Sequence, residues 1–288
     1  MMENHWIALV LLSALTHPIR DLTLKGVKHP VSSYVGVALS WIVFAFLHAQ
    51  ITGQRLVLPQ TAWPFVVISA LGLTLYYYGT LSALRRGNLS VYYPIIRSSP
   101  IAIVAFSYLV MNVSYAWPVL LGIGLVMAGS LMIQKSPGGL LDDARAFGLA
   151  VLALLGSAAY SLSDAAAMQV TNEAPFLFYS YILVTLMLAG LRAFEDRGKP
   201  EPLVGIFRGW ALAPWRIIFA GLVSYLSYLL ILTAFQIGAE TAAVSAVRQA
   251  SIPVSVILAA LILKEPKFIG RISWASLIAV GIALITLG

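Results

Sequence analysis

Runs of about twenty apolar residues recur along almost the whole chain, and each is long enough to cross the ~30 Å hydrocarbon core of a bilayer as a helix. Gly, Pro or charged residues separate the runs. The runs are continuously apolar, whereas the strands of a membrane β-barrel alternate apolar and polar residues. The sequence therefore predicts an all-α integral membrane fold with ten transmembrane helices, at residues 6–27, 33–51, 61–84, 90–110, 116–134, 146–169, 175–192, 214–237, 240–263 and 270–287.

Composition excludes several other classes of protein. Of the 288 residues, 60% are hydrophobic and 10% are charged, which leaves too few polar side chains to cover a soluble globule. The net charge of +7 is spread over loops, where its placement matters more than its sum, so we predict no nucleic-acid partner. The chain has no cysteine, which excludes thiolate metal sites, and we predict no cofactor.

The loop charges predict an orientation in the bilayer. Fourteen of the 18 lysines and arginines lie in loops after odd-numbered spans, and only Arg55 lies in a loop on the opposite side. Because positive residues near helix ends resist translocation, both termini are predicted to be non-cytoplasmic. The start "MMENHW" lacks the charged beginning of a secretory signal, so we expect the first span to be retained. We predict a multi-pass protein of a bacterial inner membrane, present as a monomer or homodimer.

The chain contains an internal repeat. The segment "GTLSALRRGNLSVYYPIIR" at 79–97 aligns without a gap with "LILTAFQIGAETAAVSAVR" at 230–248, which pairs Arg97 with Arg248. The first and sixth spans also match and pair Asp21 with Asp164. Five helices per half is an odd number, so the second copy enters the membrane in the opposite orientation. We predict two inverted five-helix repeats, residues 1–135 and 146–288, joined by a cytoplasmic linker at 136–145.

Arg20, Arg97 and Arg248 lie inside predicted helices, and so do Asp21 and Asp164. With a rise of ~1.5 Å per residue, Asp21 and Arg97 fall in the inner third of the bilayer, and Asp164 and Arg248 fall in the outer third. A lone charge in hydrocarbon costs from ~3 to over 10 kcal/mol. We therefore expect two ion pairs, one at each depth, that act as gates in alternating access. Permanent structural pairs, or arginines that snorkel to the interface, are the alternative.

Polar residues on the same helical faces predict a binding site around these arginines. The predicted substrate-binding residues are Arg97, Arg248, Tyr93, Ser90, Thr241, Ser245, Tyr77 and Tyr228. The predicted gate or coupling residues are Asp21, Asp164 and His17. For the tyrosines and for His17, packing in the helix bundle is the competing interpretation.

The chain resembles the ten-helix drug/metabolite transporter superfamily, specifically its EamA-like group, over nearly its whole length. The resemblance depends on "ALRRGNLSVYYPIIRSSP" in the first half and "AVRQASIPVSVILAALILKEPKFIGRISWASLIAVGIALI" in the second. It implies a carrier with a central cavity between two inverted repeats, in a family whose members export amino acids or other small metabolites or exchange organic solutes. Two features depart from the family pattern: Asn112 stands at the counterpart of Glu265, and "HPIRD" replaces a Trp-Gly pair.

We therefore expect a secondary transporter that moves a small metabolite, an amino acid or an organic anion, across the membrane by alternating access in the export direction. The arginines suit carboxylate or phosphate groups, and the aspartates suit an amine or a proton as coupling ion. The alternatives are a channel-like or structural membrane subunit and an intramembrane enzyme. The chain has neither H-E-x-x-H nor G-x-S-x-G, so we predict no enzymatic activity.

Overall fold

A computed structural model describes residues 5–24, 27, 29–86, 89–134, 143–195, 197, 204–254, 257 and 268–287. Every regular element within these residues is a helix, which confirms the predicted all-α class. Seven helical segments are long and apolar enough to cross a membrane, and two shorter apolar helices accompany them. The protein is therefore an integral membrane protein that crosses the bilayer several times.

The helices of the first half are α1 (His5–Leu24), α2 (Pro30–Thr52), the 3-10 turn η1 (Gln60–Ala62), α3 (Trp63–Arg86), α4 (Leu89–Ile96), α5 (Ser99–Met111) and α6 (Trp117–Gln134). Those of the second half are α7 (Ala144–Ala167), α8 (Glu173–Glu195), α9 (Val204–Leu212), α10 (Pro214–Gln236), α11 (Thr241–Val247), the 3-10 turn η2 (Arg248–Ala250) and α13 (Phe268–Leu287). Each predicted span coincides with one or two of these helices. The resemblance residues Lys264 and Glu265 lie outside the described residues.

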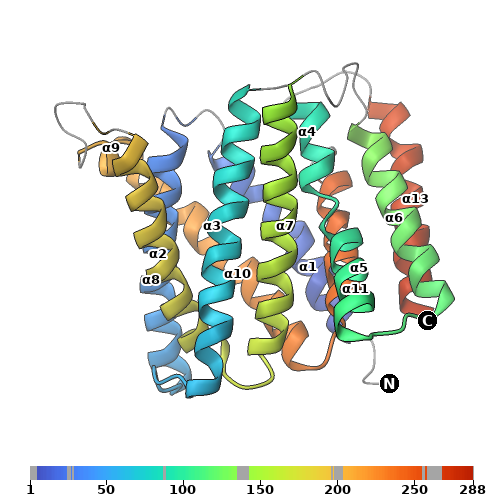
Figure 1. Ribbon diagram of the computed structural model, residues 1–288, viewed down its shortest axis with the longest axis horizontal. Helices are drawn as coiled ribbons and strands as arrows, with labels where there is room; N and C mark the ends of the chain where they lie inside the picture. The colour runs from blue at the N-terminus through green and yellow to red at the C-terminus, as the bar shows by residue number, and fades with distance from the viewer. Residues whose placement is uncertain are drawn as a thin grey trace.

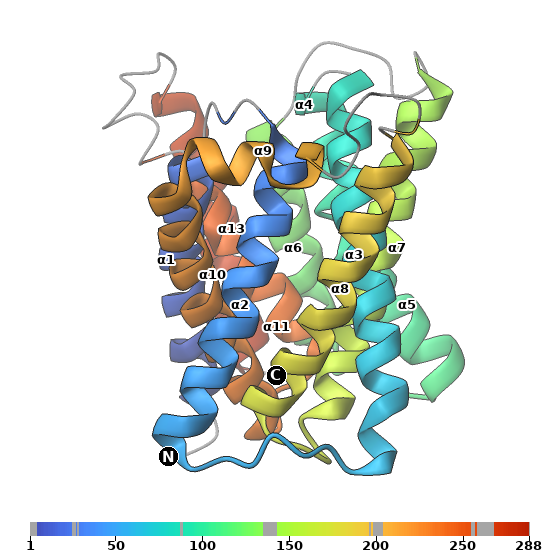
Figure 2. The same ribbon diagram turned by 90° about the vertical axis from the view of Figure 1, so that its left-hand side faces the viewer.

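The long helices stand side by side, and α1 begins at the end of the bundle where α13 ends (Figure 1). The short helix α9 lies across the opposite end (Figure 2). Phe207, Leu212 and Trp215 are exposed on and just after α9, as expected for a helix at a membrane surface. Because α1 begins and α13 ends at the same end of the bundle, the chain between these two points crosses the bundle an even number of times.

Small residues bring two pairs of helices into close contact. A Cβ atom on Gly72 of α3 would lie 2.8 Å from the Gly156 carbonyl oxygen of α7, and one on Gly156 would lie 2.6 Å from the Gly72 carbonyl oxygen. Gly122 of α6 and Gly281 of α13 face each other in the same way, at 2.6 Å in both directions. Because lipid tails offer no hydrophobic drive for helix association, such close backbone packing is a main source of stability in a membrane bundle. The other extensive pairs are α1 with α10 and α2 with α8.

Two of the predicted spans are broken helices rather than continuous ones. The span 90–110 divides into α4 and α5 at Arg97 and Ser98. Pro100 lies at the start of α5, and a proline cannot donate the backbone hydrogen bond that would continue α4. The span 240–263 begins as α11, which ends at Val247 and gives way to η2 at Arg248. Each of these two predicted spans therefore contains more than one helical segment.

Candidate functional site

A cavity lies inside the bundle and is lined by α1, α2, α3, α7, α8 and α10, together with the two helix breaks. Its volume is about 50 Å³, which holds only a few water molecules. A metabolite needs a larger space, since ligand pockets usually span roughly 300–1,000 Å³. The helices around the cavity must therefore move apart before a metabolite can enter.

Four basic side chains line this cavity, and none of the described lining residues is acidic. His17 and Arg20 come from α1, Arg97 comes from the α4–α5 break, and Arg248 comes from η2. Nη2 of Arg20 lies 3.3 Å from Nε2 of His17. A guanidinium stays charged at any physiological pH. The described lining is therefore strongly positive.

Arg97 is held at the break by a residue one turn earlier. Its Nε donates a hydrogen bond to the hydroxyl oxygen of Tyr93 at 3.2 Å, and its Cζ lies 5.2 Å from the centre of the Tyr93 ring. An aromatic ring stabilises a cation that lies over its face. Tyr93 thus contacts the cation without being part of the cavity lining.

Tyr228 of α10 links Arg248 to Asp164 of α7. The Arg248 Cζ lies 5.6 Å from the centre of the Tyr228 ring. The Tyr228 hydroxyl donates a hydrogen bond to Oδ2 of Asp164, whose side chain is fully buried. The other carboxylate oxygen, Oδ1, has no hydrogen-bond partner. The expected direct ion pair between Asp164 and Arg248 is not formed. Instead, Tyr228 lies in contact with both groups: its hydroxyl donates to the carboxylate, and its ring lies against the guanidinium.

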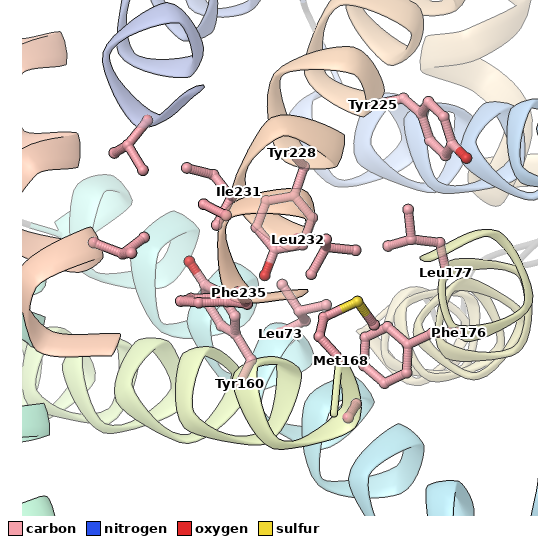
Figure 3. Close-up of a cluster of buried hydrophobic side chains, with 14 of the residues drawn as sticks. Leu73, Tyr160, Met168, Phe176, Leu177, Tyr225, Tyr228, Ile231, Leu232 and Phe235 are labelled. Atoms are coloured by element: carbon pink, nitrogen blue, oxygen red, sulfur yellow. The ribbon is translucent and has the colours of Figure 1, made fainter. Parts of the chain in front are cut away.

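Aromatic rings form one wall of the cavity. Trp41 of α2 stacks on Tyr181 of α8, with ring centres 4.1 Å apart and planes inclined by 22°. The centre of the Tyr228 ring is 5.7 Å from that of Trp41 and 6.3 Å from that of Tyr160. Figure 3 shows Tyr160 and Tyr228 on either side of Leu73, in the same buried cluster. Rings packed in this way give the cavity a rigid wall that spans α2, α7, α8 and α10.

Hydroxyl groups occupy much of the remaining lining. Ser99 of α5 and Ser245 of α11 are 3.4 Å apart at their hydroxyl oxygens, so the two broken segments meet here. The Trp41 indole nitrogen donates to the Ser224 hydroxyl at 2.9 Å. Serine hydroxyls donate and accept hydrogen bonds and can therefore bind a polar ligand. The lining serines are Ser99, Ser157, Ser161, Ser224, Ser227 and Ser245.

Gln249 forms a second link between the two breaks. Its Nε2 donates to the backbone oxygen of Arg97 at 2.9 Å, across a sequence separation of 152 residues. This bond attaches the backbone at Arg97 to Gln249, the residue that follows Arg248. The two lining arginines are therefore connected through a single hydrogen bond.

Tyr115, in the α5–α6 loop, contacts the start of α11. Its hydroxyl donates to Oε1 of Glu240 at 3.0 Å, and the Glu240 carboxylate also accepts hydrogen bonds from the amides of Ala242 and Ala243. Burial and the neighbouring Glu240 carboxylate raise the pKa of Tyr115 to about 12. The phenol therefore keeps its proton at physiological pH and can continue to donate.

The structure brings most, but not all, of the predicted site residues to the cavity. Those that line it are Arg97, Arg248, Ser245, Tyr77, Tyr228 and His17. Tyr93 and Asp164 lie one contact behind it. Thr241 is buried at the start of α11 and does not line it. The side chains of Ser90 and Asp21 lie outside the described residues, and so does the predicted Asp21–Arg97 pair.

Several lining residues were not predicted from the sequence. Arg20 had a usable signal, because it is a charged residue in an apolar run. No sequence signal separated the other lining residues from residues of the same type elsewhere in the chain. These residues are Trp41, Tyr160, Tyr181 and Gln249. Aromatic and small polar side chains occur throughout membrane helices, so only the rotation of each helix shows which of them face inward.

Comparison with known proteins identifies a family for the first half of the chain. Residues 4–134 match the model of the EamA-like transporter family. The chain is also similar to a solved structure titled "Crystal structure of protein", with a TM-score of 0.76 and 16% identity over 98% of this chain and 97% of that one. At this identity, the likeness shows the fold alone. No curated protein matches the sequence.

Proposed function

Because residues 4–134 match the EamA-like transporter family, a family of membrane transporters in the drug/metabolite transporter superfamily, we propose that this chain is a secondary carrier of a small organic anion. The observation that carries this proposal is the charge of the cavity. Arg20, Arg97 and Arg248 line it, and no acidic side chain does among the described lining residues. No enzymatic activity is proposed.

The electrostatic argument favours an anion over a cation or a zwitterion. Two unit charges 4 Å apart interact by about 4 kcal/mol at an effective dielectric constant of 20, so Arg248 attracts an anion bound at that distance and repels a cation by an amount of this order. The guanidinium of Arg248 contacts the face of Tyr228 but forms no hydrogen bond with a described residue. Its N–H groups can therefore bind the paired oxygens of a carboxylate or phosphate. The ammonium group of an amino acid would meet only cations and neutral dipoles on the described lining.

Alternating access is the second part of the proposal, and the helix pairing supports it. If α1 and α7 are equivalent by an inverted repeat, and α3 and α10 likewise, then the observed α1–α10 pair corresponds to the observed α3–α7 pair. The α2–α8 and α6–α13 pairs each correspond to themselves. A two-fold arrangement of this kind allows one set of contacts to open while its counterpart closes around a fixed midplane site. We propose the same repeat boundaries as above, 1–135 and 146–288.

Proton coupling through Asp164 is the third part. Asp164 is fully buried, and one of its oxygens has no hydrogen-bond partner. Tyr228 connects its other oxygen to the ring that carries Arg248. An anion bound at Arg248 would neutralise the nearest positive charge and leave the buried carboxylate uncompensated. Uptake of a proton by Asp164 would remove that cost, so anion and proton are proposed to bind together.

Counterflow in proteoliposomes tests the charge of the substrate. Vesicles preloaded with an unlabelled compound are diluted into a trace of the labelled one, with dicarboxylates, hydroxy acids, amino acids and organic cations as the compounds. The proposal expects saturable counterflow for at least one organic anion and none for cations. Saturable counterflow of cations alone, or no saturable exchange of any anion, would overturn it. An outward preference in cells that express the protein would support the export direction.

A further inference from the structure

The buried side-chain amide of Gln249 forms a hydrogen bond with a described residue at only one of its two polar ends. Its side chain is 3% exposed, and it lies in the cavity lining beside Arg248. Its Nε2 donates to the Arg97 backbone oxygen at 2.9 Å. Because a carbonyl oxygen can only accept, this bond fixes which end of the amide is nitrogen. The remaining end, Oε1, is buried and receives no hydrogen bond from the part of the chain that the structure describes.

The break between α4 and α5 explains why the Arg97 carbonyl is available to Gln249. In a continuous helix, the amide of Ile101 would donate to the Arg97 oxygen, four residues earlier. Here the Ile101 amide instead donates to the Ser98 oxygen at 3.1 Å. Backbone groups freed at a break inside a membrane bundle require another partner. Gln249 supplies that partner, and this fixes the position of its own amide.

The Gln249 Oε1 atom lacks a hydrogen-bond partner among the described residues, and this indicates what the cavity binds. Buried polar atoms in folded proteins nearly always have a hydrogen-bond partner, and an exception needs an explanation. Gln249 cannot turn its oxygen elsewhere without giving up the Arg97 carbonyl. The missing partner is therefore not among the described residues, and the cavity is where a donor from outside the chain can arrive.

We propose that Oε1 of Gln249 accepts a hydrogen bond from a hydroxyl group of the transported anion, so that the substrate is a hydroxylated organic acid. This inference depends on the proposed function above and narrows it. The acidic group of the substrate binds the arginines, and a hydroxyl group near it reaches Gln249, which is adjacent in sequence to Arg248 and bonded to the backbone of Arg97. The serines of the lining suit further hydroxyl groups.

A hydroxyl group fits this position better than an ammonium group does. Both can donate to an amide oxygen. An ammonium group would, however, carry a positive charge into a described lining that already holds three arginines and no carboxylate. A hydroxyl group brings a donor without a charge. The same arrangement therefore favours a hydroxy acid over the corresponding amino acid.

Specificity from such a group is large enough to measure. A site that binds a substrate hydroxyl discriminates against the analogue that lacks it, because the buried protein group is then left unpaired. The usual cost of an unpaired buried polar group corresponds to a preference of about 10- to 100-fold. Proteoliposomes are assayed with probes that differ by one group: lactate against propionate, L-malate against succinate, and lactate against L-alanine.

Gln249→Met removes the acceptor while keeping a similar length and shape. Gln169→Met is the matched control, since the Gln169 Nε2 also donates to a backbone oxygen, that of Phe235 at 2.9 Å, but Gln169 does not line the cavity. We expect the wild-type protein and Gln169→Met to prefer the hydroxylated member of a pair about tenfold or more. We expect Gln249→Met to transport both members with a ratio near one.

The ratio within a pair separates specificity from a general loss of activity, because poor folding lowers transport of both members alike. Wild-type protein that transports organic acids without preferring the hydroxylated ones would overturn the inference and leave the proposed function standing. A preference for L-alanine over lactate would overturn it as well, and so would an unchanged ratio in Gln249→Met. If no organic anion is transported at all, the proposed function itself fails.

Discussion

The hydroxyl group of Tyr228 donates a hydrogen bond to the carboxylate of Asp164, and these two side chains lie on different helices, 64 residues apart in the sequence. Asp164 is fully buried on α7, and Tyr228 is nearly so on α10. Ser69 of α3 is a second hydroxyl neighbour of the same carboxylate. The Tyr228–Asp164 pair connects the buried carboxylate to the cavity.

Replacing Tyr228 with phenylalanine should therefore destabilise the protein. Tyr228→Phe keeps the ring beneath Arg248 but removes the hydrogen bond that Tyr228 donates to the Asp164 carboxylate. An unsatisfied buried group of this kind costs about 1–3 kcal/mol, and more when it is charged. Thermal unfolding in detergent measures the effect. Tyr179→Phe is the control, because it loses a hydrogen bond to the Leu56 backbone oxygen and no carboxylate; an equal shift in both variants would contradict the prediction.

Asp164→Asn should separate transport from proton coupling. The asparagine oxygen can still accept the Tyr228 hydrogen bond, but the side chain no longer carries a charge or takes up a proton. We expect an imposed pH gradient to accelerate anion uptake by wild-type proteoliposomes and to have no effect on the variant, while counterflow, which needs no net driving force, continues. Asp143→Asn is the control, since Asp143 caps α7 away from the cavity. A variant that still follows the pH gradient would refute the role of Asp164.

Arg248→Gln should lower anion transport by about 10- to 100-fold, which is the usual value of a charge-assisted hydrogen bond. Arg97→Gln should act in the same direction. Arg248→Lys should recover only part of the loss, because lysine offers a point charge rather than two parallel donors. Initial uptake rates at subsaturating anion concentration provide the measurement. The exposed loop residue Arg55 gives the matched control, Arg55→Gln, and wild-type rates in both cavity variants would contradict the proposed anion site.

Two glycines of α6 predict opposite responses to the same substitution. A Cβ atom on Gly122 would lie 2.6 Å from the Gly281 carbonyl oxygen, whereas a Cβ atom on Gly124 would meet nothing within 4 Å. We expect Gly122→Ala to destabilise the protein by about 1–3 kcal/mol through overpacking. Gly124→Ala should be neutral or more stable by up to ~1 kcal/mol, because alanine favours the helix. The difference in melting temperature between the two variants tests the α6–α13 contact, and equal temperatures would count against it.

The apolar runs predicted the helical membrane fold because a bilayer allows few other ways to satisfy the backbone. The positions of the helices followed from the same pattern, including the region around Pro94 and Pro100. The breaks at Arg97 and Arg248 did not, since a proline in a membrane helix is often tolerated. Neighbouring groups, such as Gln249 beside the Arg97 carbonyl, decide whether the helix continues.

Depth along a helix could be counted from the sequence, and it correctly singled out Arg97, Arg248 and Asp164 as interior charges. The partner of each charged side chain could not be derived from its depth. Asp164 was expected to pair with Arg248 because the two lie at similar depth, but the direction that each side chain faces depends on how α7, α10 and η2 are rotated against one another. Tyr228 donates a hydrogen bond to Asp164, and its ring contacts Arg248, so it is the partner of both.

The sequence by itself determined that this chain is a helical membrane protein with charges at matching depths, because hydrophobic length and charge are properties of each segment alone. Only the tertiary structure decided that three arginines share one cavity and that Tyr228 connects Asp164 to this cavity. It also decided that Oε1 of Gln249 has no hydrogen-bond partner among the described residues. These depend on the rotation of packed helices, which is set by contacts between residues far apart in the chain and leaves no periodic signal in any one segment.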